Sequence, residues 1–185
     1  TNGVIDWVFP VLDSIYNQEL SEDKYEVIVM DNGNNKEFYE MMQVYSQKHG
    51  NLIYKKTDAY EFLNEIETYK TARGLFIKFI NHRTKLVKGA LQYFYDFAND
   101  NIEDKPSIYF TNGVLDIKEE IIHCDSFEAY VKELSYWSSW STGMAFWKCD
   151  FNEIKGLDNC NYLFPHTNIL FSNKNKKHYM IDNKL

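Results

Sequence analysis

Along its first 111 residues the chain alternates between helical spacing of apolar residues and short, β-branched apolar runs. A helical period predicts an amphipathic helix, and a continuous apolar run of about six residues predicts a strand buried on both faces. Their alternation predicts an α/β fold, in which a mostly parallel, Rossmann-like sheet is flanked by helices. We expect helices over residues 4–16, 36–48, 61–73 and 88–98, and strands over residues 25–30, 51–56, 75–80 and 107–111.

The two ends of the chain depart from this pattern. A domain of this kind normally opens with a buried strand, but here the letters TNG lead directly into a helix. We therefore expect the first strand of the sheet to be missing. After Thr111 the alternation weakens into a Trp-rich segment, a short helix near Pro165 and a last strand over residues 178–182. Gly74 is expected to cap the helix that ends at residue 73.

Composition limits the class of protein and its partners. With 185 residues, 44% of them hydrophobic, one domain over residues 1–185 is the default. The net charge of −7 argues against nucleic acid as the main partner, because phosphate backbones attract concentrated Lys and Arg. Three cysteines without a Cys-x-x-Cys pair favour a reducing cytoplasm. No apolar run is long enough to span a bilayer and none resembles a signal peptide, so we expect a soluble protein.

Two polar clusters follow predicted strands. The letters DNGNN begin at Asp31, and NHR covers residues 81–83. Ligands of open α/β sheets bind beyond the carboxyl ends of the strands, so these clusters predict a nucleotide site. Asp31 would accept hydrogen bonds from a base or ribose, and Asn32 and Gly33 would let the backbone approach the ligand. The alternative is that DNG is only a tight turn.

Three stretches of the chain resemble the family-two glycosyltransferases of GT-A fold. They are VLDSIYNQ, YEVIVMDNGNN and NEIETYKTARGLFIKFINHRTKLVKGAL. In that family a strand ending in Pro-Thr precedes a Ser-Ile-x-x-Gln helix and a Tyr-Glu-Ile-Ile-Val-x-Asp-Asn-Gly-Ser segment. An Asn and a Gly follow, then an apolar strand, Asp-x-Asp and Pro-Gly-Ala-Leu. Asn64 and Gly74 match that Asn and Gly, and Thr1 and Asn2 would be the remnant of the motif after the absent strand. The similarity is strongest over residues 11–91 and loose after Pro106.

The resemblance implies an inverting transfer of a sugar from a nucleoside diphosphate donor to a glycan or lipid-linked acceptor. Enzymes of this type build bacterial capsules, lipopolysaccharide side chains and other surface polysaccharides. Residues 1–112 would bind the nucleotide sugar and residues 113–185 would face the acceptor. The protein would lie in the cytoplasm or attach peripherally to the inner face of the membrane. Asp31 occupies the position that contacts the base.

The chain departs from the family where Asp-x-Asp normally holds a divalent cation. Asn81, His82 and Arg83 stand there, and none of them is a carboxylate. The leaving diphosphate gains negative charge that something must offset. Arg83 and His82 could do so directly, because the guanidinium matches phosphate oxygens. Alternatively, Asn81 and His82 could supply neutral ligands to Mn²⁺ or Mg²⁺, or the site could bind without catalysing.

The general base of the family is an acidic residue in a Glu-Asp pair at a helix start, after a Gly-x-Asp segment. Here the letters GLD end at Asp158, and the Glu-Asp position falls near Pro165 and His166. His166 is therefore the first candidate for the base and Asp158 the second. The alternative is that His166 caps a helix or fills the core.

The segment YWSSWSTGMAFW concentrates three of the four tryptophans. Aromatic faces stack on sugar rings, so Trp137 and Trp140 are candidate acceptor or donor contacts, whereas core packing is the better reading for Trp147. An exposed aromatic patch could also hold the protein near a lipid-linked acceptor. Two other classes remain open: a catalytically inactive nucleotide-binding or glycan-binding module of the same fold, and a flavodoxin-like binding or signalling domain.

Overall fold

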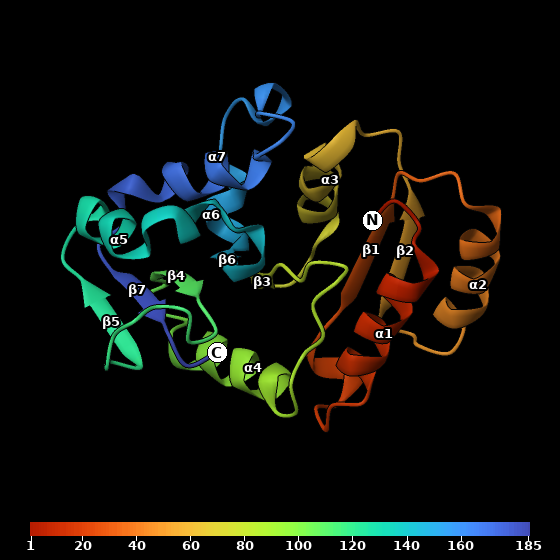
Figure 1. Ribbon diagram of the computed structural model, residues 1–185, viewed down its shortest axis with the longest axis horizontal. Coiled ribbons are helices and arrows are strands. Elements are labelled where there is room, and N and C mark those ends of the chain that lie inside the picture. Colours follow the sequence, from red (N-terminus) through yellow and green to blue (C-terminus); the bar gives the residue numbers. More distant parts are fainter.

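The structure is a computed structural model that describes residues 1–185, and it contains two separate sheets (Figure 1). The smaller sheet is a parallel pair, β1 (Val27–Asp31) and β2 (Leu52–Lys56). The larger sheet has five strands in the order β3-β6-β4-β7-β5. Its strands are β3 (Phe76–Lys78), β4 (Ser107–Phe110), β5 (Ile121–Cys124), β6 (Met144–Trp147) and β7 (Tyr179–Asp182).

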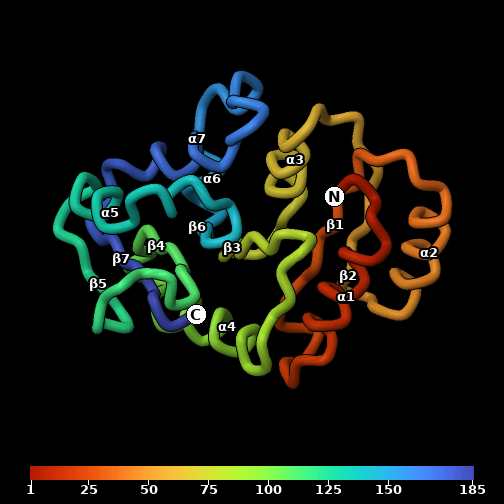
Figure 2. The backbone as a smooth tube through the Cα atoms, in the orientation of Figure 1, coloured from red at the N-terminus to blue at the C-terminus, as the bar shows by residue number.

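Seven α-helices surround the sheets, and the tube in Figure 2 traces their order from the N-terminus beside β1 to the C-terminus near α4. They are α1 (Ile5–Tyr16), α2 (Lys36–Ser46), α3 (Asn64–Thr71), α4 (Ala90–Asp100), α5 (Phe127–Leu134), α6 (Lys148–Glu153) and α7 (Pro165–Ser172). Local sequence fixes several helix starts. The side chain of Asn35 caps α2, that of Ser126 caps α5, and Pro165 occupies the first turn of α7.

The smaller sheet has its own core. Helices α1 and α2 cover one face of it, where Val8 and Leu12 of α1 pack with Phe38 and Met42 of α2 and with Leu52 of β2. Phe38 and Met42 are completely buried at the centre of this cluster. We call the smaller sheet with α1 and α2 the first lobe, and the larger sheet with its helices the second lobe. Apolar burial of this kind contributes about 25 cal/mol per Å² removed from water.

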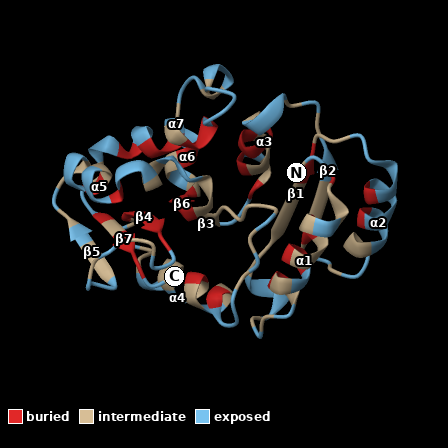
Figure 3. Cartoon of the chain, in the orientation of Figure 1, coloured by how far each residue is buried: buried red, intermediate tan, exposed pale blue.

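The larger sheet is covered on both faces. Helices α3, α5, α6 and α7 pack on one face with the core that includes Tyr109 and Phe146, and α4 packs on the other through Phe94. Helix α3 belongs to both lobes, because it contacts β1 and also packs Tyr69 against Phe146 of β6. Figure 3 shows burial concentrated on β4 and β7, while most of β1 and β3 is only half buried. None of the helices combines the length and apolarity that crossing a membrane requires.

The expected fold class is confirmed, with differences in detail. The strands and helices expected up to residue 111, the short helix at Pro165 and the last strand are all present. The pairing in the larger sheet is mixed, however: of its four pairs of neighbouring strands, only β4 with β7 is parallel. The expectation of a mostly parallel sheet missed β5 and β6, which both pair antiparallel. Strands from both sides of residue 112 share this sheet, so residues 1–112 and 113–185 are not separately folded units.

The helix expected over residues 61–73 is shorter in the structure than the apolar spacing of the sequence predicts. Residues Glu61–Leu63 form a 3-10 turn, and the α-helix ends at Thr71 with Ala72 as its C-cap. Gly74 is therefore not the cap. Its backbone N–H, 2.9 Å from Oε1 of Glu26, instead donates to that carboxylate.

Glu26 joins the start of β1 to the start of β3. Its Oε1 also accepts from the Arg73 N–H at 2.6 Å, and its Oε2 accepts from Nε of Arg73 at 3.0 Å. Burial alone would raise the pKa of the Glu26 carboxyl, but these donors together hold it below its ordinary value of 4.5. The two lobes are thus tied together at this end by one ionised side chain.

Replacing Glu26 by Gln should lower the free energy of unfolding by about 1–3 kcal/mol at pH 7, since it removes hydrogen bonds to a charged acceptor. Because the folded-state pKa lies below the unfolded one, this stability is present above pH 4.5 and is lost as the pH falls through the folded value. Urea unfolding of the wild type and Glu26→Gln should therefore converge in acid. Glu19→Gln, at an exposed ion pair with Lys88, is the matched control. A difference that persists unchanged below pH 3.5, about one unit under the ordinary value, would contradict the assignment.

Candidate functional site

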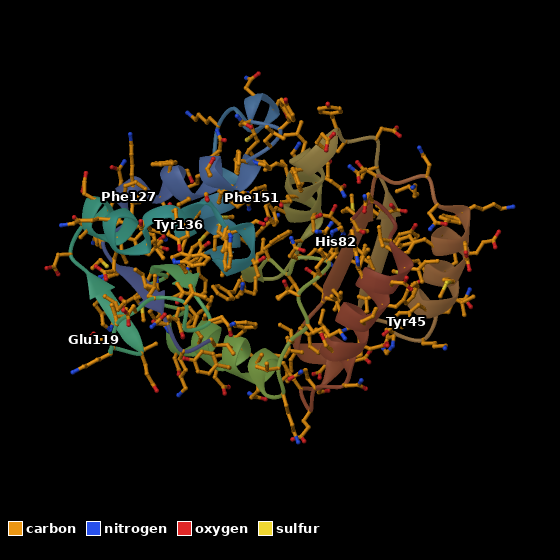
Figure 4. All side chains as sticks on the ribbon, in the orientation of Figure 1. Tyr45, His82, Glu119, Phe127, Tyr136 and Phe151 are labelled. Atoms are coloured by element: carbon orange, nitrogen blue, oxygen red, sulfur yellow. The ribbon has the colours of Figure 1, made fainter.

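Thr1 lies where the carboxyl ends of β1 and β3 meet. Its amine donates to the carbonyl of Met30 at 2.8 Å, and its carbonyl accepts from the Asn32 N–H at 3.0 Å. Its Oγ1 lies 3.0 Å from Nδ1 of His82, in the loop after β3. The two polar clusters that the sequence singled out are therefore brought together through one residue. Figure 4 shows His82 lying between the β1–β2 lobe and the rest of the molecule.

Asp31 is completely buried, and both of its carboxylate oxygens are used within the protein. Oδ1 accepts from the Gly33 N–H at 2.8 Å. Oδ2 accepts from the hydroxyl of Tyr54 at 2.8 Å and from Nζ of Lys56 at 3.0 Å. The carboxylate thus shapes the DNG turn and neutralises Lys56. The structure places Asp31 at the expected edge of the sheet, but a base that contacted it would share oxygens that already have partners.

The neighbours of Asp31 fix the surrounding loops. The amide of Asn32 donates to the carbonyls of Ala59 and Glu61, both at 3.0 Å. Gly33 passes so close to the backbone of Asn2 that a Cβ would lie 2.0 Å from its carbonyl oxygen, so only glycine fits there. The close approach at Gly33 is to the chain's own backbone, and approach to a ligand stays a prediction.

Asn64, at the start of α3, supports the same edge from below. Its Nδ2 donates to the carbonyl of Met30 at 2.8 Å, and its Oδ1 is buried without a partner. A buried amide oxygen without a donor is unusual.

The loop after β3 presents one cation and one neutral histidine. The guanidinium of Arg83 lies 3.7 Å above the ring of Trp7, which holds an exposed cation in place over α1. Burial lowers the pKa of His82 to about 4, and the positive charges of the Thr1 amine and Arg83 add to this effect. His82 is therefore neutral at pH 7. Since Thr1 Oγ1 accepts from the Gly3 N–H, its hydroxyl is free to donate to Nδ1 of His82.

The residues proposed as metal ligands are partly engaged. Oδ1 of Asn81 accepts from the Arg83 N–H at 3.0 Å, and Nδ1 of His82 faces Thr1. No group of three or more His, Cys, Asp or Glu side chains gathers in a ligating arrangement. Nε2 of His82 is the ligand atom at this loop with no partner in the protein, so a divalent cation here would need most of its ligands from the diphosphate.

His166 lies at the start of α7, as expected, but it is buried away from this edge. Its Nε2 lies 2.7 Å from the carbonyl of Ser139, and its Nδ1 faces Oε2 of Glu65 at 3.7 Å. Neither Nδ1 nor that carboxylate oxygen has a hydrogen-bond partner. Glu65 follows Asn64 in α3, so the contact with Glu65 is what connects His166 to the candidate site.

The other predicted residues lie apart from this cluster. Asp158 is an exposed side chain, 3.6 Å from Nζ of Lys70. Trp137 and Trp140 stack edge to face with ring centroids 4.1 Å apart, and Trp140 is exposed. Their carbonyls both accept from the Tyr109 hydroxyl. These rings form a separate aromatic surface on the second half of the chain.

Two side chains at the site were missed by the sequence reading. The periodicity of the first helix does not indicate that the Trp7 ring stacks under the Arg83 guanidinium. Glu65 lies within the helical pattern of α3, which gives no sign of its contact with His166. A Trp on the polar side of the first helix and a buried-face Glu beside the matched Asn64 were the signals that could have found them.

Asp31→Asn should lower the free energy of unfolding by about 1–3 kcal/mol, because the buried Tyr54 and Gly33 donors lose a charged acceptor. Asp58→Asn, an exposed change on the same side of the sheet, should alter it by less than about 0.5 kcal/mol. Equal unfolding midpoints for Asp31→Asn and the wild type would show that the carboxylate does not hold the turn, which would leave it free for a ligand.

Comparisons with known proteins identify the fold. No protein-family model and no curated protein sequence matches the chain. Among solved structures, it is similar to S. aureus TarS 1–349, with a TM-score of 0.66 at 16% identity over 98% of this chain and 55% of that one. The same protein in complex with UDP-GlcNAc gives a TM-score of 0.70 at 16% identity, covering 98% and 53%. Its complex with UDP gives 0.70 at 17%, covering 98% and 54%.

The chain thus spans about half the length of these structures. At such low identity the likeness concerns the fold alone. The chain has a GT-A-like α/β fold, with sheets flanked by helices.

Proposed function

We propose that this chain supplies the donor site of a glycosyltransferase that uses a nucleoside diphosphate sugar. The observation behind the proposal is the convergence at Thr1. Polar residues after β1, after β3 and at the start of α3 meet at one sheet edge, where α/β folds bind ligands. The fold is shared with a protein solved in complex with UDP-GlcNAc and UDP, which supports a nucleotide sugar as the ligand class.

The nucleotide would lie across the loop that Asp31 and Asn32 shape. In this proposal the base is held beside the DNG turn, and the orphaned Oδ1 of Asn64 accepts a donor from the ligand or its water. The diphosphate lies toward His82 and Arg83, which places the sugar above Thr1. This order follows from charge, since Arg83 is the one cation that the NHR loop presents to the site.

The chemical step needs charge compensation at the diphosphate. The acceptor hydroxyl attacks the anomeric carbon, the bond from that carbon to the diphosphate breaks, and the diphosphate leaves with added negative charge. His82 is neutral, so its Nε2 can offer a hydrogen bond in one tautomer or a lone pair in the other, whereas Arg83 offers a fixed positive fork. A Mn²⁺ or Mg²⁺ ion would enter with the donor, with Asn81 and His82 as weak additional ligands.

The proton of the acceptor hydroxyl must pass to a base. His166 stays the first candidate because its Nδ1 has no hydrogen-bond partner and faces Glu65, although the ring is buried away from the sheet edge. Asp158 remains the second candidate, on the exposed side of the same region. Trp137 and Trp140 would contact the acceptor, which we propose is a glycan or a lipid-linked sugar of a bacterial surface polysaccharide. Such an acceptor places the protein in the cytoplasm or peripherally at the inner face of the membrane.

A second candidate function is binding without transfer. It is favoured by the absence of any carboxylate in the NHR loop and by the bond from His166 to the Ser139 carbonyl, which occupies one ring nitrogen. Both functions predict binding of UDP or a related nucleotide. Only the enzyme predicts release of UDP when nucleotide sugar and acceptor are both present.

Arg83→Ala should lower sugar transfer by about 10²-fold or more, the range observed when a preorganised electrostatic contact is removed. A panel of nucleotide sugars, with UDP release as the readout, measures this effect. Lys85→Ala removes a positive charge from the same loop at an exposed position and should leave transfer within about twofold. A chelator should lower transfer less than Arg83→Ala does. If the chelator abolishes transfer and Arg83→Ala has no effect, the metal mechanism operates here and this account of the loop is wrong.

His166→Gln should lower turnover by about 10²–10⁴-fold with nearly unchanged affinity for the nucleotide, as expected for a general base. Glu65→Gln should also lower turnover, because it removes the carboxylate that faces the imidazole at 3.7 Å. Thermal unfolding of each variant separates catalysis from folding. Normal specific activity in a destabilised His166→Gln would show that His166 is structural, and loss of turnover in Asp158→Asn would move the base there.

A further inference from the structure

Residues 135–143 form an exposed segment of the second lobe that carries three aromatic rings. The segment lies between α5 and β6 and is built of two short 3-10 turns. The ring centroid of Trp137 lies 4.6 Å from that of Tyr136 and 4.1 Å from that of Trp140. Tyr136 is 68% exposed and Trp140 is 48% exposed, so both rings face solvent although each packs on Trp137. We call these three rings the aromatic platform.

Tyr109 of β4 fixes the backbone beneath the platform. Its hydroxyl donates to the carbonyl of Trp137 at 2.5 Å and to the carbonyl of Trp140. Its ring packs against Gly143, where a Cβ would lie 2.0 Å from Cε1 of Tyr109. Residue 143 must therefore be glycine for the tyrosine to reach both carbonyls. One buried side chain thus sets the positions of two residues of the platform.

Two further side chains hold the same segment from β3 and α7. Nζ of Lys78 donates to the Thr142 carbonyl. Nε2 of His166 lies 2.7 Å from the Ser139 carbonyl. Exposed loops are normally among the more mobile parts of a fold, but side chains from three other elements restrict this one.

The segment also begins at a strained residue. Ser135 has a φ of 52° and a ψ of −137°, a conformation that residues with a side chain rarely adopt. Such residues persist only where the surrounding structure over-determines them, and they cluster at binding and active sites. A strained start and a backbone held by several side chains indicate a surface that is shaped before any ligand arrives.

Hydroxyl groups accompany the rings of the platform. Ser138 and Ser139 lie between the two tryptophans in sequence, and their hydroxyls donate to backbone carbonyls, which leaves the oxygens able to accept. A sugar ring presents an apolar face of C–H groups and a rim of hydroxyl donors, which matches aromatic faces beside hydroxyl acceptors. A surface for an anionic bilayer would pair the rings with Lys and Arg, and residues 135–147 contain neither.

The platform lies apart from the candidate site. Figure 4 shows Tyr136 in the second lobe, away from His82. The contacts that connect the two places run from Ser139 to His166 and from His166 to Glu65 in α3. A sugar ring on the platform is therefore not the unit at which transfer occurs.

We propose that residues 135–143 bind a saccharide unit of the acceptor that is distant from the reacting unit, and that Tyr109 is the positioning residue that sets the shape of this site. The acceptor is then a glycan of several sugar units. The inference rests on the proposed function, because it specifies the acceptor class. Saccharide binding at the platform can nevertheless be measured without any nucleotide.

The test is a titration of isotope-labelled protein with cellotetraose, maltotetraose, mannotetraose and chitotetraose, followed through the indole signals of Trp137 and Trp140. We expect saturable shifts with at least one of these tetrasaccharides, and UDP should not displace it. Tyr136→Ala should weaken the binding by about tenfold, because one stacking contact is lost. Tyr39→Ala, which removes an exposed tyrosine from α2, is the control and should leave the binding unchanged.

Tyr109→Phe removes only the hydroxyl and should weaken saccharide binding by about three- to tenfold, with unchanged affinity for UDP. Tyr93→Phe, which removes a hydroxyl bonded to Asp182, is the matched control and should change neither affinity. Thermal unfolding accompanies both variants. A lower unfolding midpoint of Tyr109→Phe with full saccharide affinity would show that Tyr109 only stabilises the fold and would overturn its positioning role.

The remaining outcomes separate this proposal from the proposed function. If no tetrasaccharide shifts the Trp137 and Trp140 signals, the saccharide site is refuted, even where UDP shifts Asn32 and His82. Displacement of the tetrasaccharide by UDP would also overturn the proposal, because the sugar would then lie at the reacting edge. Binding of phosphatidylglycerol vesicles, but of no tetrasaccharide, would assign the rings to a membrane surface. Saccharide binding without any response to UDP would support the platform and contradict the donor site.

Discussion

The position of Thr1 is the constraint on which the rest of this structure depends. One residue bonds through its backbone to both sides of the β1 end and through its hydroxyl to the loop after β3. Without it, the DNG turn and the NHR loop would belong to separate lobes, since β1 and β3 do not pair directly. The candidate site therefore depends on Thr1, which connects the end of β1 to the loop after β3.

At the sheet edge around Thr1, one side chain keeps an accessible charge while its ionisable neighbours are paired or neutral. The buried carboxylate of Asp31 is neutralised by Lys56, and His82 is neutral because burial and nearby positive charges lower its pKa. Arg83 is left as the accessible charge, and its stacking on Trp7 limits where it can reach. An edge with one positioned cation and no free carboxylate suits an anionic ligand better than a bare metal ion, which agrees with a diphosphate as the bound group.

Sequence periodicity predicted the fold class because helical and strand periods in the first lobe are strong and local. It did not predict β5 and β6, since the runs around Ile121 and Met144 pair antiparallel with strands distant in sequence. Motif spacing located Asp31, Asn64 and His82, which do meet at one edge. It could not show that both Asp31 oxygens have partners or that His166 contacts Glu65, because those contacts depend on packing between helices and loops. The absence of a first strand, inferred from the letters TNG, stays a prediction.

The central claim is that a nucleotide binds at the edge formed by Thr1, Asn32 and His82. Titration of isotope-labelled protein with UDP, followed by amide chemical shifts, tests it most directly. The account predicts saturable shifts at Asn32, Gly33 and His82, reduced when Arg83 is replaced by Ala, with Trp137 and Trp140 unaffected by UDP alone. Shifts confined to the Trp137 surface, or none at the β1 and β3 ends at saturating UDP, would contradict it.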